Sequence, residues 1–399
     1  MNIFSKTYCR IYQTVFYCFL PFFPYRTPQK LTNYEEILKI LDEKGFDNIL
    51  LITGKKIRGL DLTKELEEML KNNGISTSVF DGTQVNPTTE NVLEAAKVYK
   101  ENDCQCIIAF GGGSVIDCAK GAGAVIACPN KDIRDMKGLL KVNKTLPLLI
   151  AIPTTAGTGS EATLSAVITD SETHHKFVIN DFDLIPSYTM LDAKLTLGLS
   201  QQTTATTGMD ALTHAIEAYI GRSTTPTTRK KALEAIKLIF ENLETAYNDG
   251  TNLQARKRLL KASYKAGLAF SRSYVGYVHA VAHSLGGKYN IAHGLANATI
   301  LPQMLKLYGK SVYKKLFKIA KFVGFCDETT KKEVAAKLII KKIEDMNSNM
   351  NIPSRISCIE EKDIEEMAKM AAKEANPLYP VPKLMNAKQL QTIYYMVKE

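Results

Sequence analysis

The chain has 399 residues, of which 45% are hydrophobic and 23% charged, and its formal net charge is +10. This length exceeds what one hydrophobic core usually fills, so we expect a globular protein of two domains. The lysines and arginines form no run of five or more and match no nucleic-acid-binding module, which argues against a nucleic-acid partner. The eight cysteines contain no C-x-x-C pair, which favours reduced thiols in a cytoplasmic protein.

The first 30 residues form an apolar, aromatic arm at the N-terminus, with the run I-Y-Q-T-V-F-Y-C-F-L-P-F-F-P-Y at 11–25. This run is shorter than the about twenty apolar residues that a membrane-spanning helix needs. Pro21, Pro24 and the lack of a small-residue cleavage site are not typical of a secretory signal peptide. We therefore expect a cytoplasmic protein without a transmembrane span, whose arm packs on its own body or on the partner copy of a homo-oligomer, a dimer or larger. Peripheral membrane contact is the less favoured alternative.

Residues 31–198 alternate between short apolar runs and amphipathic stretches. In the stretch 61–74, leucines recur at 62, 66 and 70, which predicts a helix. Pro87 is expected to be the first residue of the next helix, because proline is favoured at that position. The apolar runs predict four buried strands, at 48–53, 76–81, 106–110 and 148–153. This alternation predicts an α/β domain with a parallel sheet and helices on both of its faces.

Residues 199–399 contain long helical patterns and no convincing strand. The expected helices lie at 203–221, 226–248, 253–271, about 274–287, 297–323 and 330–348. We therefore predict a second, all-helical domain that begins near residue 199.

Three glycines and a serine, in F-G-G-G-S-V-I-D-C-A-K at 110–120, lie where a predicted strand is followed by a helix. Glycine allows a sharp turn and the close approach of a ligand, and the first N–H groups of a helix attract phosphate. The pattern therefore favours phosphate or pyrophosphate binding at Gly112, Gly113 and Ser114, although it is neither G-x-G-x-x-G nor a P-loop. Lys120 is a candidate for contact with a phosphate or a partner helix.

A second polar turn, P-T-T-A-G-T-G-S-E-A-T at 153–163, follows the fourth predicted strand directly. Ligands of parallel sheets bind where strands end. Thr154, Thr155 and Thr158 supply small hydrogen-bond donors there. A hydroxyl-rich loop without a ligand is the alternative interpretation.

An aspartate and a histidine, Asp210 and His214, lie four residues apart in the predicted helix T-G-M-D-A-L-T-H-A-I-E-A-Y-I. Side chains at i and i+4 project from the same face of a helix. Taken alone, this pair is equally compatible with a helix-stabilising ion pair and with part of a metal site.

His279, His283 and His293 lie in V-H-A-V-A-H-S-L-G-G-K-Y-N-I-A-H-G at 278–294, in a chain with only six histidines. The first two are again at i and i+4 on an expected helix, which Gly286–Gly287 is expected to end. One carboxylate and several imidazoles form a ligand set for Fe²⁺, Zn²⁺, Co²⁺ or Mn²⁺, and the lack of thiolates favours a catalytic ion over a structural one. No H-E-x-x-H is present, which argues against a metalloprotease.

Four segments together resemble the iron-containing (group III) alcohol dehydrogenases, whose fold is shared with glycerol dehydrogenase and dehydroquinate synthase. They are G-G-G-S-V-I-D-C-A-K (111–120), P-T-T-A-G-T-G-S-E (153–161), T-G-M-D-A-L-T-H-A-I-E-A-Y (207–219) and H-A-V-A-H-S-L-G-G-K-Y-N-I-A-H-G-L-A-N-A (279–298). The resemblance is to members that act on butanol, 1,3-propanediol or lactaldehyde. It implies an N-terminal α/β domain with a dinucleotide-binding sheet and a C-terminal all-α metal-binding domain. It also implies reversible hydride transfer between a primary alcohol or diol, its aldehyde and NAD(P).

The resemblance implies roles for individual residues. A metal ion, Fe²⁺ or alternatively Zn²⁺, would be held by Asp210, His214, His279 and His293. His283 would not be a ligand but would carry the proton of the alcohol. Cofactor contacts are implied at Gly112, Gly113, Ser114, Thr154, Thr155, Asn86, Thr163 and Lys176.

Gly54 departs from the family pattern. Many NAD-specific members carry an aspartate after the first strand, where its carboxylate binds the adenosine ribose and repels a 2′-phosphate. Here the sequence is I-T-G-K-K at 52–56, with Gly54 in that place. Glycine removes the repulsion, and Lys55 or Lys56 could attract a phosphate, so both NAD and NADP are candidate cofactors.

Three alternatives are open. A lyase of the dehydroquinate synthase type would use the same fold and would need additional basic residues for a phosphorylated substrate. A metal-dependent hydrolase would have no use for a nicotinamide, so oxidation of NAD(P)H by an aldehyde separates it from a dehydrogenase. A shell or filament protein would tolerate the loss of His279 and His293.

Overall fold

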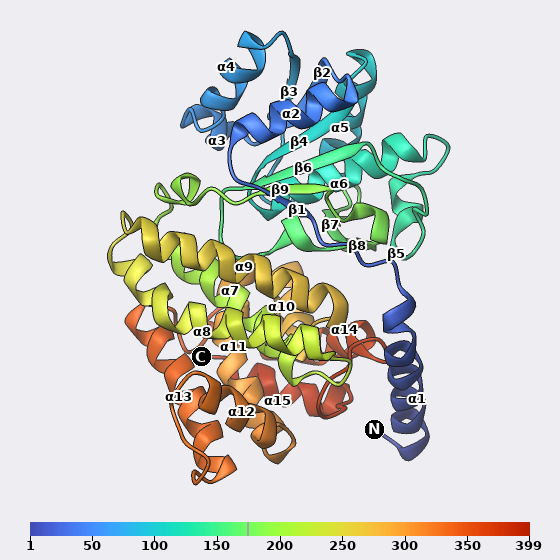
Figure 1. The fold of residues 1–399 in the computed structure, drawn as a ribbon. Helices are drawn as coiled ribbons and strands as arrows, with labels where there is room; N and C mark the ends of the chain where they lie inside the picture. Colours follow the sequence, from blue (N-terminus) through green and yellow to red (C-terminus); the bar gives the residue numbers. More distant parts are fainter. Residues whose placement is uncertain (174) are drawn as a thin grey trace. The chain divides into compact units, whose positions relative to one another are not determined.

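The computed structural model describes residues 1–173 and 175–399, which form two compact units (Figure 1). One unit is Pro24–Gly198 and combines strands with helices. The other unit consists of Leu199–Glu399 together with Met1–Phe23 and is helical. The predicted fold class, an α/β part followed by an all-helical part, is confirmed.

A six-stranded sheet, with strand order β1-β9-β6-β4-β2-β3, forms the centre of the α/β unit. All of its neighbouring strands run parallel, as the alternation of strands and helices predicts. The short strands β1 and β9 are not predicted by the sequence, because three residues are too few for a periodic signal. The strands are β1 (Gln29–Leu31), β2 (Asn48–Ile52), β3 (Ser76–Phe80), β4 (Cys106–Gly111), β6 (Leu148–Pro153) and β9 (Tyr188–Met190).

Helices cover both faces of this sheet, as Figure 1 shows, and successive side chains of a strand enter different cores. In β4, Ile107 and Ala109 pack with α5 and α6, whereas Ile108 and Phe110 pack with α2 and α4. Because both faces are covered, the sequence of β4 is continuously apolar rather than alternating. The helices of this unit are α2 (Tyr34–Lys44), α3 (Lys55–Gly59), α4 (Lys64–Asn72), α5 (Thr89–Glu101) and α6 (Gly113–Ala127).

A smaller, three-stranded sheet of order β5-β8-β7 also belongs to the α/β unit. Its strands are β5 (Gly138–Leu139), β7 (Ser165–Thr169) and β8 (Lys176–Asn180), and β7 and β8 pair antiparallel. The sequence does not predict this hairpin. Short 3-10 helices connect the elements of the unit: η2 (Ile133–Met136), η3 (Ser160–Ala162), η4 (Phe182–Leu184) and η5 (Ala193–Thr196).

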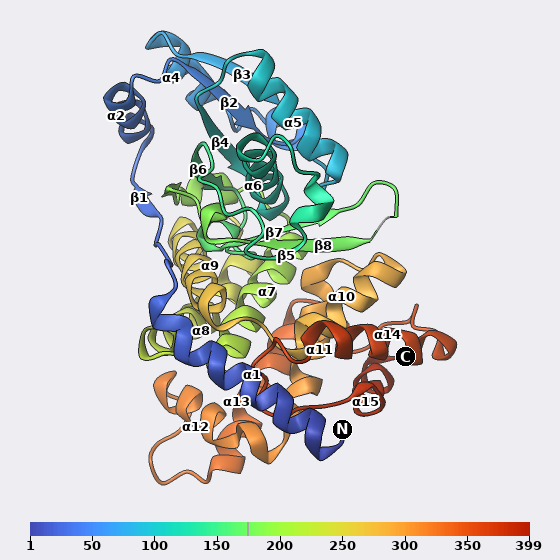
Figure 2. The same ribbon diagram turned by 90° about the vertical axis from the view of Figure 1, so that its right-hand side faces the viewer.

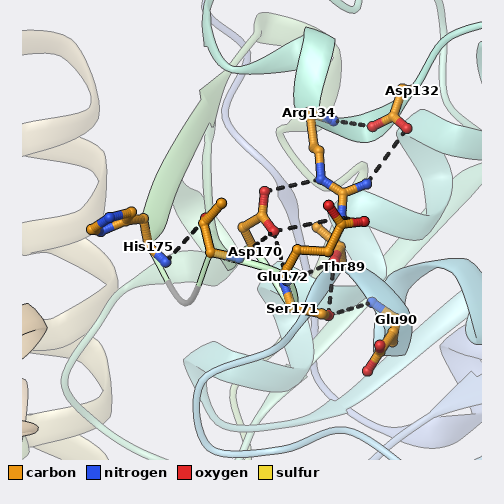
Figure 3. Close-up of polar contacts among 9 residues, drawn as sticks. Thr89, Glu90, Asp132, Arg134, Asp170, Ser171, Glu172 and His175 are labelled. Atoms are coloured by element: carbon orange, nitrogen blue, oxygen red, sulfur yellow. Dashed lines mark hydrogen bonds and ion pairs between the residues drawn. The ribbon is translucent and has the colours of Figure 1, made fainter.

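Polar contacts hold the chain that follows β7 (Figure 3). Arg134 donates to Asp170 Oδ2 at 2.9 Å and to Glu172 Oε1 at 2.9 Å. The hydrogen bonds from Arg134, together with two from backbone N–H groups, lower the pKa of Asp170 to about 2. The Thr89 and Ser171 hydroxyls lie 2.9 Å apart, which connects this chain to the start of α5.

The start of α5 differs from the prediction at Pro87. The helix begins at Thr89, with Thr88 as its N-cap, so Pro87 precedes the helix. The Thr88 hydroxyl accepts a hydrogen bond from the Asn91 N–H at 3.2 Å, and Asn91 Oδ1 accepts one from the Thr88 N–H at 3.3 Å. This capping box satisfies two N–H groups at once and fixes the helix start after the proline.

The helical unit contains one break that the sequence does not predict. The single helix expected at 297–323 is two helices, α11 and α12, separated by Gly309 with a φ of +53°. Glycine adopts this conformation without strain, and the apolar pattern continues across it. The helices of this unit, seen from a second side in Figure 2, are α1 (Ile3–Phe19), η1 (Leu20–Phe22), α7 (Gln201–Ile220), α8 (Pro226–Asn248), α9 (Leu253–Ser273), α10 (Tyr277–Tyr289), α11 (His293–Tyr308), α12 (Lys310–Phe322), α13 (Lys332–Asn349), α14 (Glu361–Ala375) and α15 (Ala387–Val397).

Within residues 1–173 and 175–399, no helix combines the length and the apolar character needed to cross a membrane.

Candidate metal centre and cofactor edge

The predicted metal ligands come from three helices of the helical unit. Asp210 and His214 lie one turn apart on α7, His279 lies on α10, and His293 is the first residue of α11. Asp210 and His214 are 3% and 5% exposed, so α7 holds a carboxylate and an imidazole in the interior of the unit. His279 is also buried, and His293 is partly exposed at its helix end.

Asp210, His279 and His293 each offer one ligand atom, and these three atoms lie within 4.8 Å of one another. Asp210 Oδ1 is 3.5 Å from His293 Nε2 and 3.8 Å from His279 Nε2. His279 Nε2 is buried and has no hydrogen-bond partner. A buried polar atom in this state is costly, and a bound cation would satisfy it. The three residues therefore fit a divalent metal ion, and this donor set suits Fe²⁺ or Zn²⁺.

His214, the fourth predicted ligand, lies beside this group of three. Its Nδ1 is 3.9 Å from Asp210 Oδ2. Its ring stacks on the rings of His279 and Phe270, with centroids 4.4 Å and 4.1 Å away. The spacing of four residues along α7 thus places His214 next to the candidate metal position.

Glu217, one turn further along α7, is a residue to which the sequence assigns no role. Its Oε2 accepts hydrogen bonds from His279 Nδ1 and from the Gly276 N–H, both at 2.7 Å, and its Oε1 accepts one from the Val278 N–H at 2.8 Å. Burial raises the pKa of Glu217 to about 7, although these hydrogen bonds lower it. Because Nδ1 of His279 is engaged with a carboxylate, the ring presents the lone pair of Nε2, which is the form that a metal requires.

Asn297 and Gly294 hold the start of α11 close to α7. Asn297 Nδ2 donates to Asp210 Oδ1 at 2.7 Å and lies 3.1 Å from His293 Nε2. A Cβ atom on Gly294 would lie 2.4 Å from the carbonyl oxygen of Thr206, so glycine is what lets the two backbones approach there. The sequence motif contains both residues, but their contacts with α7 cannot be read from spacing along the chain.

The turn between α10 and α11 corrects one prediction. Gly286 and Gly287 lie inside α10, which continues to Tyr289. The helix ends at Asn290, whose φ of +54° is in the left-handed region. Glycine is the more common residue there, but asparagine tolerates this conformation better than most other residues do. Asn290, and not the glycine pair, therefore turns the chain towards His293.

The predicted cofactor residues of the α/β unit follow the strands of its parallel sheet. Gly54 follows β2, Asn86 lies in the loop after β3, Gly112 follows β4, and Thr154 follows β6. The carboxyl ends of parallel strands meet at one edge of a sheet, and ligands of α/β proteins bind at that edge. We call this the cofactor edge.

Two glycines of the turn at 110–120 allow it to contact the turn at 153–163, at the cofactor edge. A Cβ atom on Gly113 would lie 2.6 Å from the side chain of Thr158, and one on Gly112 would lie 3.3 Å from that of Thr155. Gly112 is also the N-cap of α6. The structure thus brings together the residues that the sequence singles out in these two turns.

The loop after β3 connects three further predicted residues. The Ser114 hydroxyl donates to the carbonyl oxygen of Val85, and Lys176 Nζ donates to Asn86 Oδ1 at 2.8 Å. Ser114, Asn86 and Lys176 are therefore held by the same loop.

Lys120 and Thr163 have partners inside the protein. Lys120 is buried, and its Nζ lies 2.7–3.1 Å from backbone and hydroxyl oxygens of Ser160, Thr163 and Ser165, including the Thr163 hydroxyl at 2.9 Å. Asp117 Oδ1 accepts from the Ser160 hydroxyl at 2.5 Å. Lys120 therefore stabilises the turn at 153–163 from the protein interior and is not placed to contact a phosphate.

Family comparisons cover both units. The model for "Iron-containing alcohol dehydrogenase" matches residues 26–193, and the model for "Fe-containing alcohol dehydrogenase family, C-terminal" matches residues 204–397. The chain belongs to the iron-containing alcohol dehydrogenase family.

Individual relatives of this alcohol dehydrogenase agree with the family. The 1,3-propanediol dehydrogenase of Citrobacter freundii is 38% identical over 372 residues, which cover 92% of this chain and 95% of that protein. The NADPH-dependent butanol dehydrogenase of Clostridium saccharobutylicum is 34% identical over 315 residues, 78% of this chain and 80% of that protein. A crystal structure of a 1,3-propanediol oxidoreductase has a TM-score of 0.89 and 35% identity, with 94% of this chain and 99% of that chain covered.

As an alcohol dehydrogenase, the chain is an oxidoreductase that acts on small molecules. The comparisons give no support to a lyase of the dehydroquinate synthase type or to a hydrolase.

His283 of this alcohol dehydrogenase lies one turn along α10 from His279, and its ring stacks on that of His293 with centroids 5.1 Å apart. Its Nδ1 lies 2.8 Å from Glu374 Oε1, and the Tyr379 hydroxyl donates to the same oxygen at 2.8 Å. The His283 and Glu374 side chains are 30% and 34% exposed, so this pair reaches solvent. The sequence assigns no role to Glu374 or Tyr379, because neither lies in a recognised motif.

Proposed function

We propose that the chain oxidises primary alcohols or diols to aldehydes and catalyses the reverse reduction, with NAD(P) and a divalent ion, Fe²⁺ or alternatively Zn²⁺. The observation that carries the proposal is the group of buried Asp210, buried His279 and partly exposed His293, in which His279 Nε2 has no hydrogen-bond partner. The printed names of the propanediol and butanol relatives support small alcohols and diols as the substrate class.

The proposed metal ligands are Asp210, His214, His279 and His293. Glu217 orients His279 through Nδ1, and Asn297 holds the Asp210 carboxylate by a hydrogen bond to Oδ1. A divalent ion bound there supplies positive charge that stabilises negative charge on the substrate oxygen.

The proposed cofactor site is the cofactor edge of the α/β unit. Gly112, Gly113 and Ser114 at the start of α6 are assigned to the pyrophosphate, because N–H groups at a helix start attract anions. The further cofactor residues in this proposal are Thr154, Thr155, Asn86, Lys176, Gly54 and Thr163, the last as a residue of the second polar turn that Lys120 holds through its carbonyl and hydroxyl oxygens. A nicotinamide held there would supply the hydride-transfer chemistry.

NADP is included in the proposal because of the residues that follow β2. Gly54 offers no carboxylate to repel a 2′-phosphate, and Lys55 and Lys56, which come next, are exposed. The butanol relative is named as NADPH-dependent, which agrees with this assignment.

We assign to His283 the role of accepting the proton that the alcohol loses. Glu374 accepts the hydrogen of His283 Nδ1, which leaves Nε2 as the nitrogen that takes up a proton. Tyr379 donates to Glu374 Oε1 and so holds the carboxylate against the imidazole. The partial exposure of both side chains gives the proton a path to solvent.

The test is oxidation of NADH and NADPH by a series of short aldehydes, with protein loaded with Fe²⁺ or Zn²⁺. The reduced cofactor is followed by its near-ultraviolet absorbance. We expect turnover by the natural chain and a loss of about a hundredfold or more in Asp210→Ala and His279→Ala. Glu241→Gln, an exposed residue of α8 that pairs with Lys237, is the control and keeps full activity. If no aldehyde oxidises either cofactor, or if His279→Ala is fully active, the proposal is wrong.

We also propose a cytoplasmic location and a homo-oligomer. All eight cysteines are free thiols, which agrees with a reducing compartment. β1 is one of the two edge strands of the large sheet, and such an edge strand can pair with a partner copy. Sedimentation velocity of the full chain measures the oligomeric state, and a monomer at all concentrations would contradict this part of the proposal.

A further inference from the structure

The N-terminal helix α1 contacts the rest of the helical unit through a side that carries Arg10, Gln13 and Phe16, whose ring centroid lies 5.2 Å from that of Tyr274. Arg10 donates to two backbone carbonyls of the segment 377–382, at 2.8 Å and 3.1 Å. Gln13, which is buried, donates to two further carbonyls of the same segment, at 3.0 Å and 2.8 Å. Cys9 is buried beside them. In Figure 2, α1 lies on the outside of the helical unit.

The opposite side of α1 is apolar and faces outward. Its large side chains recur every three or four residues, so they form one stripe along the helix, which continues into η1. Each of them is at least 50% exposed. The stripe, which we call the outer face of α1, consists of Phe4, Tyr8, Ile11, Val15, Phe19 and Phe22.

This orientation differs from that of an ordinary surface helix, because most of the large apolar side chains of α1 are exposed. Amphipathic helices of globular proteins bury their apolar stripe and expose their polar side, whereas α1 buries Gln13 and exposes the outer face. The hydrogen bonds of Arg10 and Gln13 fix the helix in this orientation. An exposed apolar patch of this extent is typical of a surface that contacts another apolar phase or partner.

The charged residues around α1 are basic. The first 34 residues contain no aspartate or glutamate, and Lys6 is exposed one turn from Arg10. Burial and then the charge of Arg222 lower the pKa of Arg10 to about 10, so Arg222 lies close to this helix. Lys383, also exposed, directly follows the segment that Arg10 binds. These positive charges are complementary to an anionic surface.

We propose that the outer face of α1 binds the surface of a bilayer that contains anionic lipids, with the helix lying along the membrane. Aromatic and aliphatic side chains beside basic residues are the composition of helices that bind at the lipid interface. This inference is independent of the catalytic site. A second copy of the chain fits the surface less well, because it would place a second N-terminal segment with basic residues and no acidic residue against the first.

The test is co-sedimentation of the full chain with vesicles of phosphatidylcholine alone or with about one third phosphatidylglycerol. We expect binding to the anionic vesicles that weakens as salt is added, and weak binding to the neutral ones. The triple variant Phe4→Ser, Ile11→Ser and Val15→Ser should lower the partition coefficient by about tenfold or more. Lys6→Glu should lower it by about fivefold or more on anionic vesicles only.

The matched control is a triple variant of exposed apolar residues elsewhere in the helical unit, Leu253→Ser, Val334→Ser and Leu338→Ser. It should bind vesicles as the natural chain does, and circular dichroism checks that every variant is folded. The proposal is overturned if the natural chain binds no vesicle, or if the α1 variant binds as well as the control. It is also overturned if sedimentation velocity without lipid shows oligomers that only the α1 variant loses, since the occupant is then a second copy.

Discussion

Glu217 and His279 are joined by a 2.7 Å hydrogen bond in the interior of the helical unit. The same carboxylate accepts the N–H groups of Gly276 and Val278, so it fixes both the imidazole ring and the backbone at the start of α10. A ligand that is oriented before the ion arrives binds it more tightly. Glu217 should therefore contribute to metal affinity more than to substrate binding.

Glu217→Gln should weaken metal binding by about 10–100-fold, because an amide orients the His279 ring less well than a carboxylate does. Titration of Co²⁺ into metal-free protein, followed by its visible absorption, measures this without an activity assay. Glu241→Gln on the surface of α8 should leave the affinity unchanged. Equal Co²⁺ affinity in both variants would show that Glu217 does not position the ligand.

Gly54→Asp should shift the cofactor preference away from NADPH. The backbone at Gly54 has a φ of −125°, and a Cβ atom there would meet only the Thr83 carbonyl at 3.5 Å, so the variant should fold. A carboxylate at this place repels a 2′-phosphate, and the KM for NADPH should rise about tenfold or more while that for NADH changes less. Gly59→Asp, at the other end of α3, is the control with the same added charge. An unchanged KM for NADPH would show that the adenosine of the cofactor does not bind beside residue 54.

Glu161→Gln should stabilise the chain at alkaline pH and not at acid pH. Glu161 is buried with no hydrogen-bond partner at Oε1, and burial raises its pKa from 4.5 to about 7. Between these two values the folded chain binds more protons than the unfolded chain, so the stability of the natural chain falls as the pH rises through this window. The variant should therefore be more stable by about 1–3 kcal/mol near pH 8, and the gain should shrink towards pH 5. Denaturant unfolding across this range measures it, and a gain that is independent of pH would contradict the assignment.

At this scale the sequence predicts residues whose spacing is local. Asp210 and His214 share a helix face because they lie at i and i+4, and the three consecutive glycines predict the turn before α6. Glu217 lies in the same motif as His214, and an acidic residue on an apolar helix could have indicated a supporting role. Glu374 could not be predicted, because its contact with His283 joins α14 to α10 and no pattern along the chain encodes that distance.

At the scale of elements, the helix ends decide where site residues lie. The apolar pattern predicts the presence of α10 and α11, but not that Asn290 ends the first or that Gly309 ends the second. Each of these ends depends on a single residue with a positive φ, and the spacing of apolar residues does not indicate where such a residue lies. The sequence does not predict the hairpin of β7 and β8 for a different reason: contacts that hold it, the pairing of β8 with β5 and the bond from Arg134 to Asp170, come from elsewhere in the chain.

Three substitutions at the end of α10 distinguish the roles of Gly287 and of Asn290, the C-cap of the helix. Gly287→Ala should raise the free energy of unfolding by about 0.5–1 kcal/mol, because the position is inside the helix and a Cβ atom meets nothing within 4 Å. Asn290→Val should lower it by about 1–2 kcal/mol, because a β-branched residue resists the left-handed conformation, whereas Asn290→Gly should be tolerated. Denaturant unfolding measures all three. A destabilising Gly287→Ala would mean that the glycine pair makes the turn after all.

At the scale of the whole molecule, each unit carries one part of the proposed chemistry. The α/β unit presents Gly112, Gly113 and Thr154 after its parallel strands, and the helical unit brings Asp210, His279 and His293 together from three helices. The change from strand–helix alternation to consecutive helices makes this division visible in the sequence. The orientation of α1 does not follow from the sequence, because an amphipathic pattern gives a helix two sides without saying which one is buried.

The central claim is that the group of Asp210, His214, His279 and His293 holds the catalytic ion. The most direct test is anomalous X-ray scattering from crystals grown with Fe²⁺ or Zn²⁺, with data collected on both sides of the metal absorption edge. We expect one strong anomalous peak at about 2.0–2.2 Å from Asp210 and the histidine Nε2 atoms, and no peak in His279→Ala crystals grown in the same way. A peak at any other position, or none in the natural protein at saturating metal, would contradict the claim.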